Sequence, residues 1–188
     1  LTFAYMGEHH VRRLSPRAGP TAGGTTVMLQ GVGISPSGAL CKFDGTALLP
    51  RRLSHERIGC ISPRSLAPTL TSVRVSGQDD GVRAWDEAVV FMVAPAASVA
   101  RLQPTLGPVG GGTVVLLIGR FPFSTMSETA AFCNFNRTIV PGTIVLPTLV
   151  RCRTPVVLVP GYVGVEVSGN LLDFSHGGLL FSYEPVQL

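Results

Sequence analysis

The glycine-rich segment Gly19-Pro20-Thr21-Ala22-Gly23-Gly24-Thr25 recurs 88 residues later as Gly107-Pro108-Val109-Gly110-Gly111-Gly112-Thr113. The same turn residues in the same order, at a fixed offset, indicate an internal repeat. The flanking residues repeat at that offset too: Leu14-Ser15-Pro16 with Leu102-Gln103-Pro104, and Gly31 with Gly119. The chain therefore contains one structural unit written twice.

Beyond Gly31 the repeat continues at an offset of 92 residues. The matches are Cys41-Lys42-Phe43 with Cys133-Asn134-Phe135, Cys60-Ile61-Ser62-Pro63 with Cys152-Arg153-Thr154-Pro155, Val73-Arg74-Val75-Ser76-Gly77 with Val165-Glu166-Val167-Ser168-Gly169 and, at an offset of 90, Phe91-Met92-Val93 with Phe181-Ser182-Tyr183. The change of offset places a four-residue insertion in the second copy, between Phe121 and Ala131. We therefore predict domains at residues 9–94 and 95–188. Residues 1–8 are expected to end a preceding copy, because Phe3-Ala4-Tyr5 has the pattern of Phe181-Ser182-Tyr183.

Composition and periodicity predict an all-β fold. The 188 residues include 22 Gly and 15 Pro, and only 14% are charged, which excludes a disordered tail and a long-helix protein. Apolar residues alternate as they do in strands, for example at Val27 and Leu29, and again at Val115 and Leu117. About seven short strands per copy predict two tandem antiparallel β-sandwiches.

The charge pattern does not favour nucleic-acid binding. The net charge is +4, but the positive residues, all Arg except Lys42, form only short separate groups such as Arg12-Arg13 and Arg51-Arg52. No apolar run reaches the 18 residues of a membrane span, and residues 1–6 lack the pattern of a signal peptide. We expect no direct membrane insertion in this segment.

The four cysteines form two pairs with the same spacing of 19 positions, Cys41 with Cys60 and Cys133 with Cys152. An even count with repeated spacing is typical of one disulfide in each domain. The alternative is four reduced, buried cysteines. A zinc site is less favoured, because there is no Cys-x-x-Cys and the histidines do not repeat. Disulfides predict a secreted or cell-surface location.

Asn136-Arg137-Thr138 has the sequence of an N-glycosylation site. Asn136 aligns with Asp44, and Asp44-Gly45 is a strong signal for a hairpin turn. A glycosylation sequence in a hairpin turn would be exposed. The alternative is an unmodified turn asparagine.

These repeated residues resemble the IPT/TIG domain: Pro16, Gly19-Pro20, Gly23-Gly24-Thr25, Gly31 and the two Cys in each copy. The likeness covers nearly the whole chain and implies immunoglobulin-like β-sandwiches. Such domains occur in plexin-type receptors and other surface proteins, in Rel-type transcription factors, and as accessory domains of some carbohydrate-active enzymes. In the extracellular members the paired cysteines match Cys41/Cys60 and Cys133/Cys152. The first copy departs from the pattern at Val93, where an aromatic residue is usual.

No motif in the chain predicts catalysis, a cofactor or a metal. The Gly107–Thr113 run lacks the Lys-Ser/Thr ending of a phosphate-binding loop. Asp79-Asp80 is interpreted as part of a solvated loop rather than a calcium site. In the insertion of the second copy, Phe121, Phe123 and Met126 are candidates either to contact a partner or to cover the end of the sandwich.

We therefore hypothesise non-catalytic structural and adhesion modules in a repeat-containing surface glycoprotein, with a ciliary surface as one setting. The expected partners are other proteins, further copies of the same array and neighbouring IPT/TIG repeats. Two alternatives stay open: an intracellular DNA-associated IPT module, and an accessory domain of a secreted carbohydrate-active enzyme.

Overall fold

The structure is a computed structural model and describes residues 10–32, 39–52, 54, 56–77, 88–122 and 130–185. Over these residues the regular elements are all β-strands, which confirms the predicted fold class. The chain divides into two compact units, Leu1–Ala94 and Pro95–Leu188. Residues 1–8, which we expect to end a preceding repeat, lie outside the described residues.

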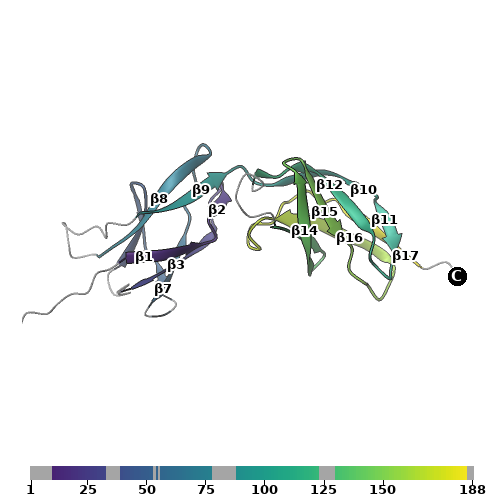
Figure 1. Cartoon of the computed structure of the whole chain (residues 1–188), viewed down its shortest axis with the longest axis horizontal. Coiled ribbons are helices and arrows are strands. Elements are labelled where there is room, and N and C mark those ends of the chain that lie inside the picture. Colours follow the sequence, from purple (N-terminus) through teal and green to yellow (C-terminus); the bar gives the residue numbers. More distant parts are fainter. Residues whose placement is uncertain are drawn as a thin grey trace, which may run out of the picture. The chain divides into compact units, whose positions relative to one another are not determined.

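The first unit is a sandwich of two sheets (Figure 1). One sheet has the order β1 (His10–Ser15), β3 (Thr26–Val32), β7 (Arg57–Ile61), β6 (Arg51–Arg52). The other has the order β2 (Ala18–Pro20), β9 (Val89–Ala94), β8 (Thr69–Gly77), β4 (Ala39–Phe43), β5 (Thr46–Leu48). The β2–β9 pair is parallel and the other pairs are antiparallel.

The second unit repeats these two layers with one continuous strand order. The order is β10 (Ser98–Gln103), β12 (Val114–Arg120), β15 (Leu149–Arg153), β14 (Thr138–Leu146), β13 (Ala130–Phe135), β16 (Gly161–Ser168), β17 (Leu180–Glu184), β11 (Leu106–Pro108). The layers are joined because β14 pairs with β13 over its first part and with β15 over its second part. The long β14 therefore passes from one sheet to the other.

In the first unit the counterpart of β14 is broken into β5 and β6. The break falls at Leu49-Pro50, and Pro50 aligns with Gly142 of β14. Proline has no N–H to donate and fixes its own φ, so it can interrupt a strand ladder, although β14 continues through Pro141, which lies one position before Gly142 and pairs with Phe132. At Gly142 a Cβ would lie 2.7 Å from the Cys152 sulfur, so the strand passes the disulfide where no side chain fits.

More strand segments are present than the seven expected for each copy, because proline divides the first strand as well. The chain turns at Pro16 between β1 and β2, and at Pro104 between β10 and β11. After each break the second segment joins the opposite sheet. The two units also share an irregularity of register, after Val11 in β1 and after Val99 in β10.

The glycine turn is built in the same way in both units. Gly111 has φ +70°, and a Cβ there would lie 2.7 Å from the backbone of Pro155. Gly23 has φ +73° and the same close approach to Pro63. A side chain at either position would meet both a left-handed backbone and a neighbouring strand end.

The threonine after each glycine turn is hydrogen-bonded to the residue that follows β7 in the first unit and β15 in the second. The Thr113 N–H donates to the Thr154 hydroxyl (3.1 Å), and the Thr154 N–H donates to the Thr113 carbonyl (2.9 Å). In the first unit Thr25 and Ser62 make the same two bonds, at 3.1 and 2.9 Å. These reciprocal bonds satisfy buried backbone groups and explain why both copies keep this turn.

Each unit has its own apolar core between its sheets. Phe43 and Phe91 meet edge to face at 5.9 Å in the first core, and Phe135 and Phe181 do so at 6.1 Å in the second. Such pairs stabilise a core beyond the area that they bury.

Candidate functional site

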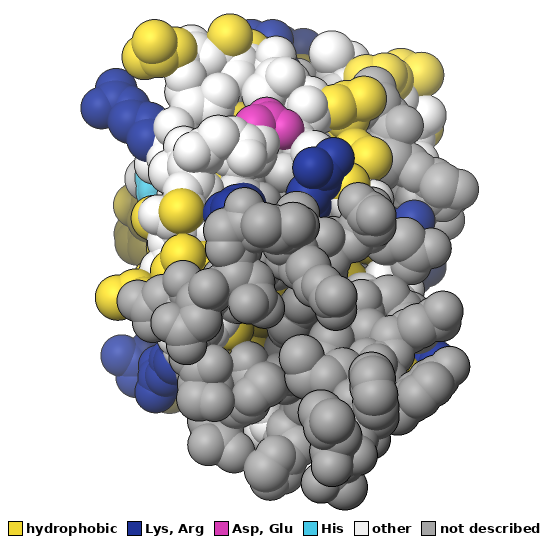
Figure 2. Space-filling model, turned by 90° about the vertical axis from the view of Figure 1, so that its left-hand side faces the viewer, with side chains coloured by type: hydrophobic (Ala, Val, Ile, Leu, Met, Phe, Trp, Pro, Cys, Tyr) yellow, Lys and Arg dark blue, Asp and Glu magenta, His cyan; other side chains and the backbone are white. Residues whose placement is uncertain are grey.

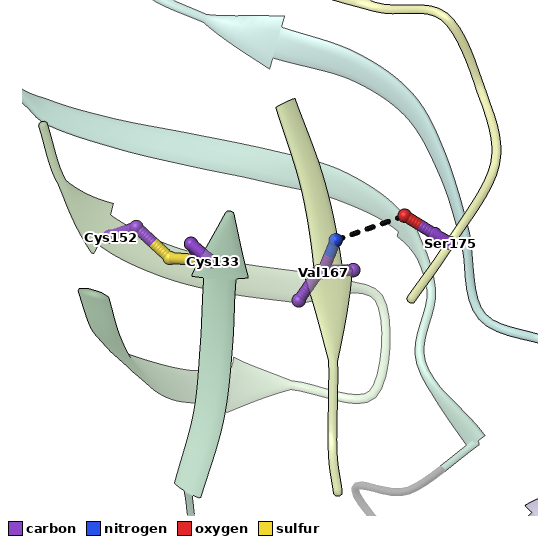
Figure 3. Close-up of a disulfide and its surroundings, with 4 residues drawn as sticks. All are labelled: Cys133, Cys152, Val167 and Ser175. Atoms are coloured by element: carbon purple, nitrogen blue, oxygen red, sulfur yellow. Dashed lines mark hydrogen bonds between the residues drawn. A yellow bond between two sulfur atoms is a disulfide. The ribbon is translucent and has the colours of Figure 1, made fainter. Parts of the chain in front are cut away.

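A buried disulfide links the two sheets of each unit. Cys41 of β4 is bonded to Cys60 of β7, with Cα atoms 6.1 Å apart. Cys133 of β13 is bonded to Cys152 of β15, with Cα atoms 6.4 Å apart (Figure 3). No free cysteine is left in the chain, and the pairing follows the 19-residue spacing.

The loop after β16 is hydrogen-bonded back to β16 at Val167, the residue that pairs with Cys133 of the disulfide. The Val167 N–H donates to the Ser175 hydroxyl (3.0 Å, Figure 3), and the Ser175 N–H donates to the Val167 carbonyl (2.8 Å). Both residues are buried. Ser175 therefore has a structural role that the repeat comparison did not identify, because the matching segment of the first copy differs in sequence.

Asn136 occupies the turn between β13 and β14 and is exposed, together with Arg137 and Thr138. Its φ is +56°, and Asp44 has φ +48° in the equivalent turn between β4 and β5. Asparagine and aspartate tolerate this left-handed conformation better than other side chains. The structure therefore places the glycosylation sequence in an exposed hairpin turn.

Of the two roles predicted for Phe121, its burial agrees with covering the end of the sandwich and not with contacting a partner. Its side chain is 1% exposed and belongs to the core of the second unit, where a partner cannot reach it. An apolar side chain in a loop at the end of a sandwich removes more surface from water by folding inward. Phe123 and Met126, the other two candidates, lie outside the described residues.

Tyr183 of β17 closes the aromatic cluster of the second core. Its ring lies 5.1 Å from that of Phe181, and its hydroxyl donates to the Pro155 carbonyl at 3.0 Å. Burial raises the pKa of Tyr183 above its usual 10.0, and a hydrogen bond with Thr154 lowers it by less. In the first unit Val93 stands at this position and is also buried, so the departure from the family pattern preserves the core.

We expect the second unit to lose stability above pH 10 through Tyr183. The fold raises the pKa, so an unfolded tyrosine ionises first, and ionisation therefore favours the unfolded state. Below pH 10 this contribution is constant. Denaturant unfolding measured from pH 8 to pH 11 should show a steeper loss for the natural chain than for Tyr183→Phe. Parallel curves for the two chains would show that Tyr183 does not control this loss.

The outward side of one sheet of the first unit carries apolar and basic side chains. Leu70 of β8 is 68% exposed and Val90 of β9 is 58% exposed. Arg74, four residues after Leu70 and on the same side of β8, is exposed and lies opposite Lys42 of β4. We call Lys42, Leu70, Arg74 and Val90 the first face.

The equivalent side of the second unit carries apolar and acidic side chains. Tyr162 of β16 is 75% exposed and Leu180 of β17 is 54% exposed. Glu166 lies opposite Asn134 of β13, whose Nδ2 donates to Glu166 Oε2 at 3.2 Å. We call Asn134, Tyr162, Glu166 and Leu180 the second face.

Neither face was predicted from the sequence. The signal was present, because Leu70 and Val90 fall at positions of β8 and β9 that would be polar on a solvated sheet side. On the side of the molecule drawn in Figure 2, Lys and Arg side chains lie among hydrophobic ones over the described surface.

Among the described residues, no three His, Cys, Asp or Glu side chains are placed to hold a metal ion.

Part of the chain matches a known protein family. Residues 10–85 match the IPT/TIG domain. The first unit is an IPT/TIG domain. The residues of this IPT/TIG domain include the glycine turn, the Cys41–Cys60 disulfide and the β4 and β8 positions of the first face.

Two solved structures of the plexin A4 extracellular region are similar to the chain over almost its whole length. The structure of domains 1 to 10 has a TM-score of 0.60 and 18% identity, and the match covers 96% of this chain and 16% of the plexin chain. The structure of domains 1 to 8 has a TM-score of 0.51 and 20% identity, and the match covers 93% of this chain and 18% of the plexin chain. At these identities the likeness shows the fold, two immunoglobulin-like β-sandwiches. The chain spans less than a fifth of each plexin chain.

Within the part of the chain that the structure describes, no helix has the length and hydrophobicity needed to cross a membrane.

Proposed function

We propose that the chain is a pair of non-catalytic extracellular modules that bind other proteins within a larger surface or secreted glycoprotein. The observation that carries this proposal is the buried disulfide at the same place in each unit. Such bonds persist in oxidising compartments and are rare in the cytosol. The likeness in fold to an extracellular receptor region supports the same location.

We also propose that the second unit, residues 95–188, is an IPT/TIG domain like the first, residues 9–94. The support is physical, because the second unit repeats the glycine turn, the disulfide and the strand registers of the first. It adds an aromatic closing residue, Tyr183, which the first unit lacks.

A binding role fits the surface better than a catalytic one. The buried Thr25, Ser62 and Thr154 are occupied by the turn hydrogen bonds. The side chains left on the two sheet faces are apolar residues and single charges, which suit adhesion to another protein surface.

Glycosylation of Asn136 tests the extracellular location. We expect the chain, secreted from eukaryotic cells, to carry an N-glycan at Asn136, and we expect Asn136→Asp to remove it without loss of stability. Asp44 fills the equivalent turn with a similar φ, so aspartate should preserve the backbone. Intact mass measured before and after enzymatic removal of N-glycans checks this.

Thr138→Ala is the matched control, because it destroys the glycosylation sequence and leaves Asn136 in place. Both variants should lose the same mass. A secreted natural chain with the mass of the bare polypeptide would contradict the glycan. A chain that is retained in the cell with reduced cysteines would contradict the extracellular function itself.

A further inference from the structure

The two faces occupy equivalent positions of the two units and carry opposite charge. Each residue of the first face has its counterpart in the second: Lys42 with Asn134, Leu70 with Tyr162, Arg74 with Glu166, and Val90 with Leu180. The replacement of Lys and Arg by Asn and Glu changes a basic site into an acidic one. At the margins of the faces, His176 Nδ1 lies 3.9 Å from Glu166 Oε1, and Asp44 in the turn after β4 accepts a hydrogen bond from the Ser72 N–H.

On both faces an exposed apolar side chain stands four residues before a charged one on the same strand, and on the second face the exposed Glu184 follows Leu180 on the same side of β17. Leu70 and Arg74 are four residues apart on β8, as Tyr162 and Glu166 are on β16, which is about 13 Å along a strand. Val90 lies opposite Ser72, between Leu70 and Arg74, and Leu180 lies opposite Gly164 in the same way. Each face therefore offers an apolar patch beside a charge.

A contact between unlike faces satisfies both parts of this arrangement. Two packed sheets keep their strands nearly aligned, and when the strands run in the same direction the apolar ends face one another and the charged ends face one another. In that orientation, two first faces would bring Lys42 and Arg74 of one chain close to the same residues of another chain. Two second faces would bring the two copies of Glu166 together. Repulsion between like charges disfavours both contacts. A first face on a second face brings Arg74 to Glu166 and covers Leu70 and Tyr162.

We propose that the first face of one chain docks onto the second face of a second copy of the same chain. The inference rests on the proposed function of protein binding, and it names the partner as another copy. The contact is heterologous, so it joins chains head to tail, either into a closed pair or into a longer assembly.

The turn at Asn136 lies beside the second face, because the Asn136 N–H donates to the Gly164 carbonyl at 2.9 Å. Association is therefore measured on full chains that carry Asn136→Asp, so that no chain has a glycan at this position.

Sedimentation velocity over a range of chain concentrations tests the proposal through a charge exchange. Arg74→Glu alone and Glu166→Arg alone should each weaken self-association by about tenfold or more, because each leaves like charges facing one another. A mixture of the two single variants should associate, since the glutamate introduced on the first face of one chain then meets the arginine introduced on the second face of the other. The double variant should associate by itself.

Arg151→Glu is the control, because Arg151 is exposed on β15 of the other sheet and its reversal changes the net charge as Arg74→Glu does. It should leave association unchanged. Chains that stay monomeric at all concentrations, or single variants that associate as the parent does, would overturn the second-copy partner. So would a mixture that fails to recover. These outcomes leave the extracellular function intact, since secretion and disulfide state test that separately.

Discussion

Replacing Cys133 and Cys152 together by alanine is expected to lower the free energy of unfolding of the second unit by about 3 kcal/mol. The bond closes a loop between two residues 19 positions apart and ties β13 of one sheet to β15 of the other. Without it the unfolded chain gains conformational freedom that the folded state does not share. Because domains of this size have net stabilities of about 5–15 kcal/mol, the loss is a large part of the total.

Denaturant unfolding followed by circular dichroism measures this loss as a lower midpoint for the second unit. The matched control is Cys41→Ala with Cys60→Ala, which should lower the midpoint of the first unit by a similar amount. Because each unit has its own core, each double variant should act on its own unit. Unchanged midpoints would contradict the structural role of the disulfides.

Gly111→Ala is expected to destabilise the second unit by about 3 kcal/mol. The left-handed backbone at φ +70° costs a non-glycine residue about 1–2 kcal/mol, and the new Cβ would also lie 2.7 Å from the Pro155 backbone. Backbone cannot yield as the end of a flexible side chain can. The glycine turn and the end of β15 would have to separate.

Gly112→Ala separates these two costs. Gly112 has φ +79°, but a Cβ there would meet no atom within 4 Å, so the variant should lose only the backbone term, about 1–2 kcal/mol. The same denaturant unfolding compares both variants, and Gly23→Ala with Gly24→Ala repeats the test in the first unit. Equal losses for Gly111→Ala and Gly112→Ala would show that the close approach to Pro155 is not what selects glycine.

The fold could be predicted from the sequence because its steric demands fall on few residue types. Gly23 and Gly111 require a positive φ, and Pro16 and Pro104 stand where the first strand of each copy breaks. Both copies therefore have the same residue type at these positions. The break between β5 and β6 could not be predicted in the same way. Both copies carry a proline where the chain crosses between the sheets, Leu49-Pro50 in the first and Pro141-Gly142 in the second, and only the first copy breaks there.

The candidate site was predictable only in part. The spacing of the cysteines indicated the two disulfides, because bonded residues recur together. Phe121 was placed with the candidates for contact because an apolar loop residue does not reveal by itself whether it points inward, and its burial depends on the core around it. The two faces were not predicted because their residues differ between the copies, for example Arg74 and Glu166, and the repeat was recognised from residues that are the same in both copies.

Disulfide mapping of the secreted, non-reduced chain tests whether extracellular disulfides hold the two sandwiches together. Peptide mass spectrometry after digestion at pH below 7, with free thiols blocked beforehand, identifies each bonded pair. If both sandwiches are disulfide-linked and extracellular, we expect Cys41 bonded to Cys60, Cys133 bonded to Cys152, and no blocked thiol. Four blocked thiols in the folded chain, or bonds between the two units, would contradict it.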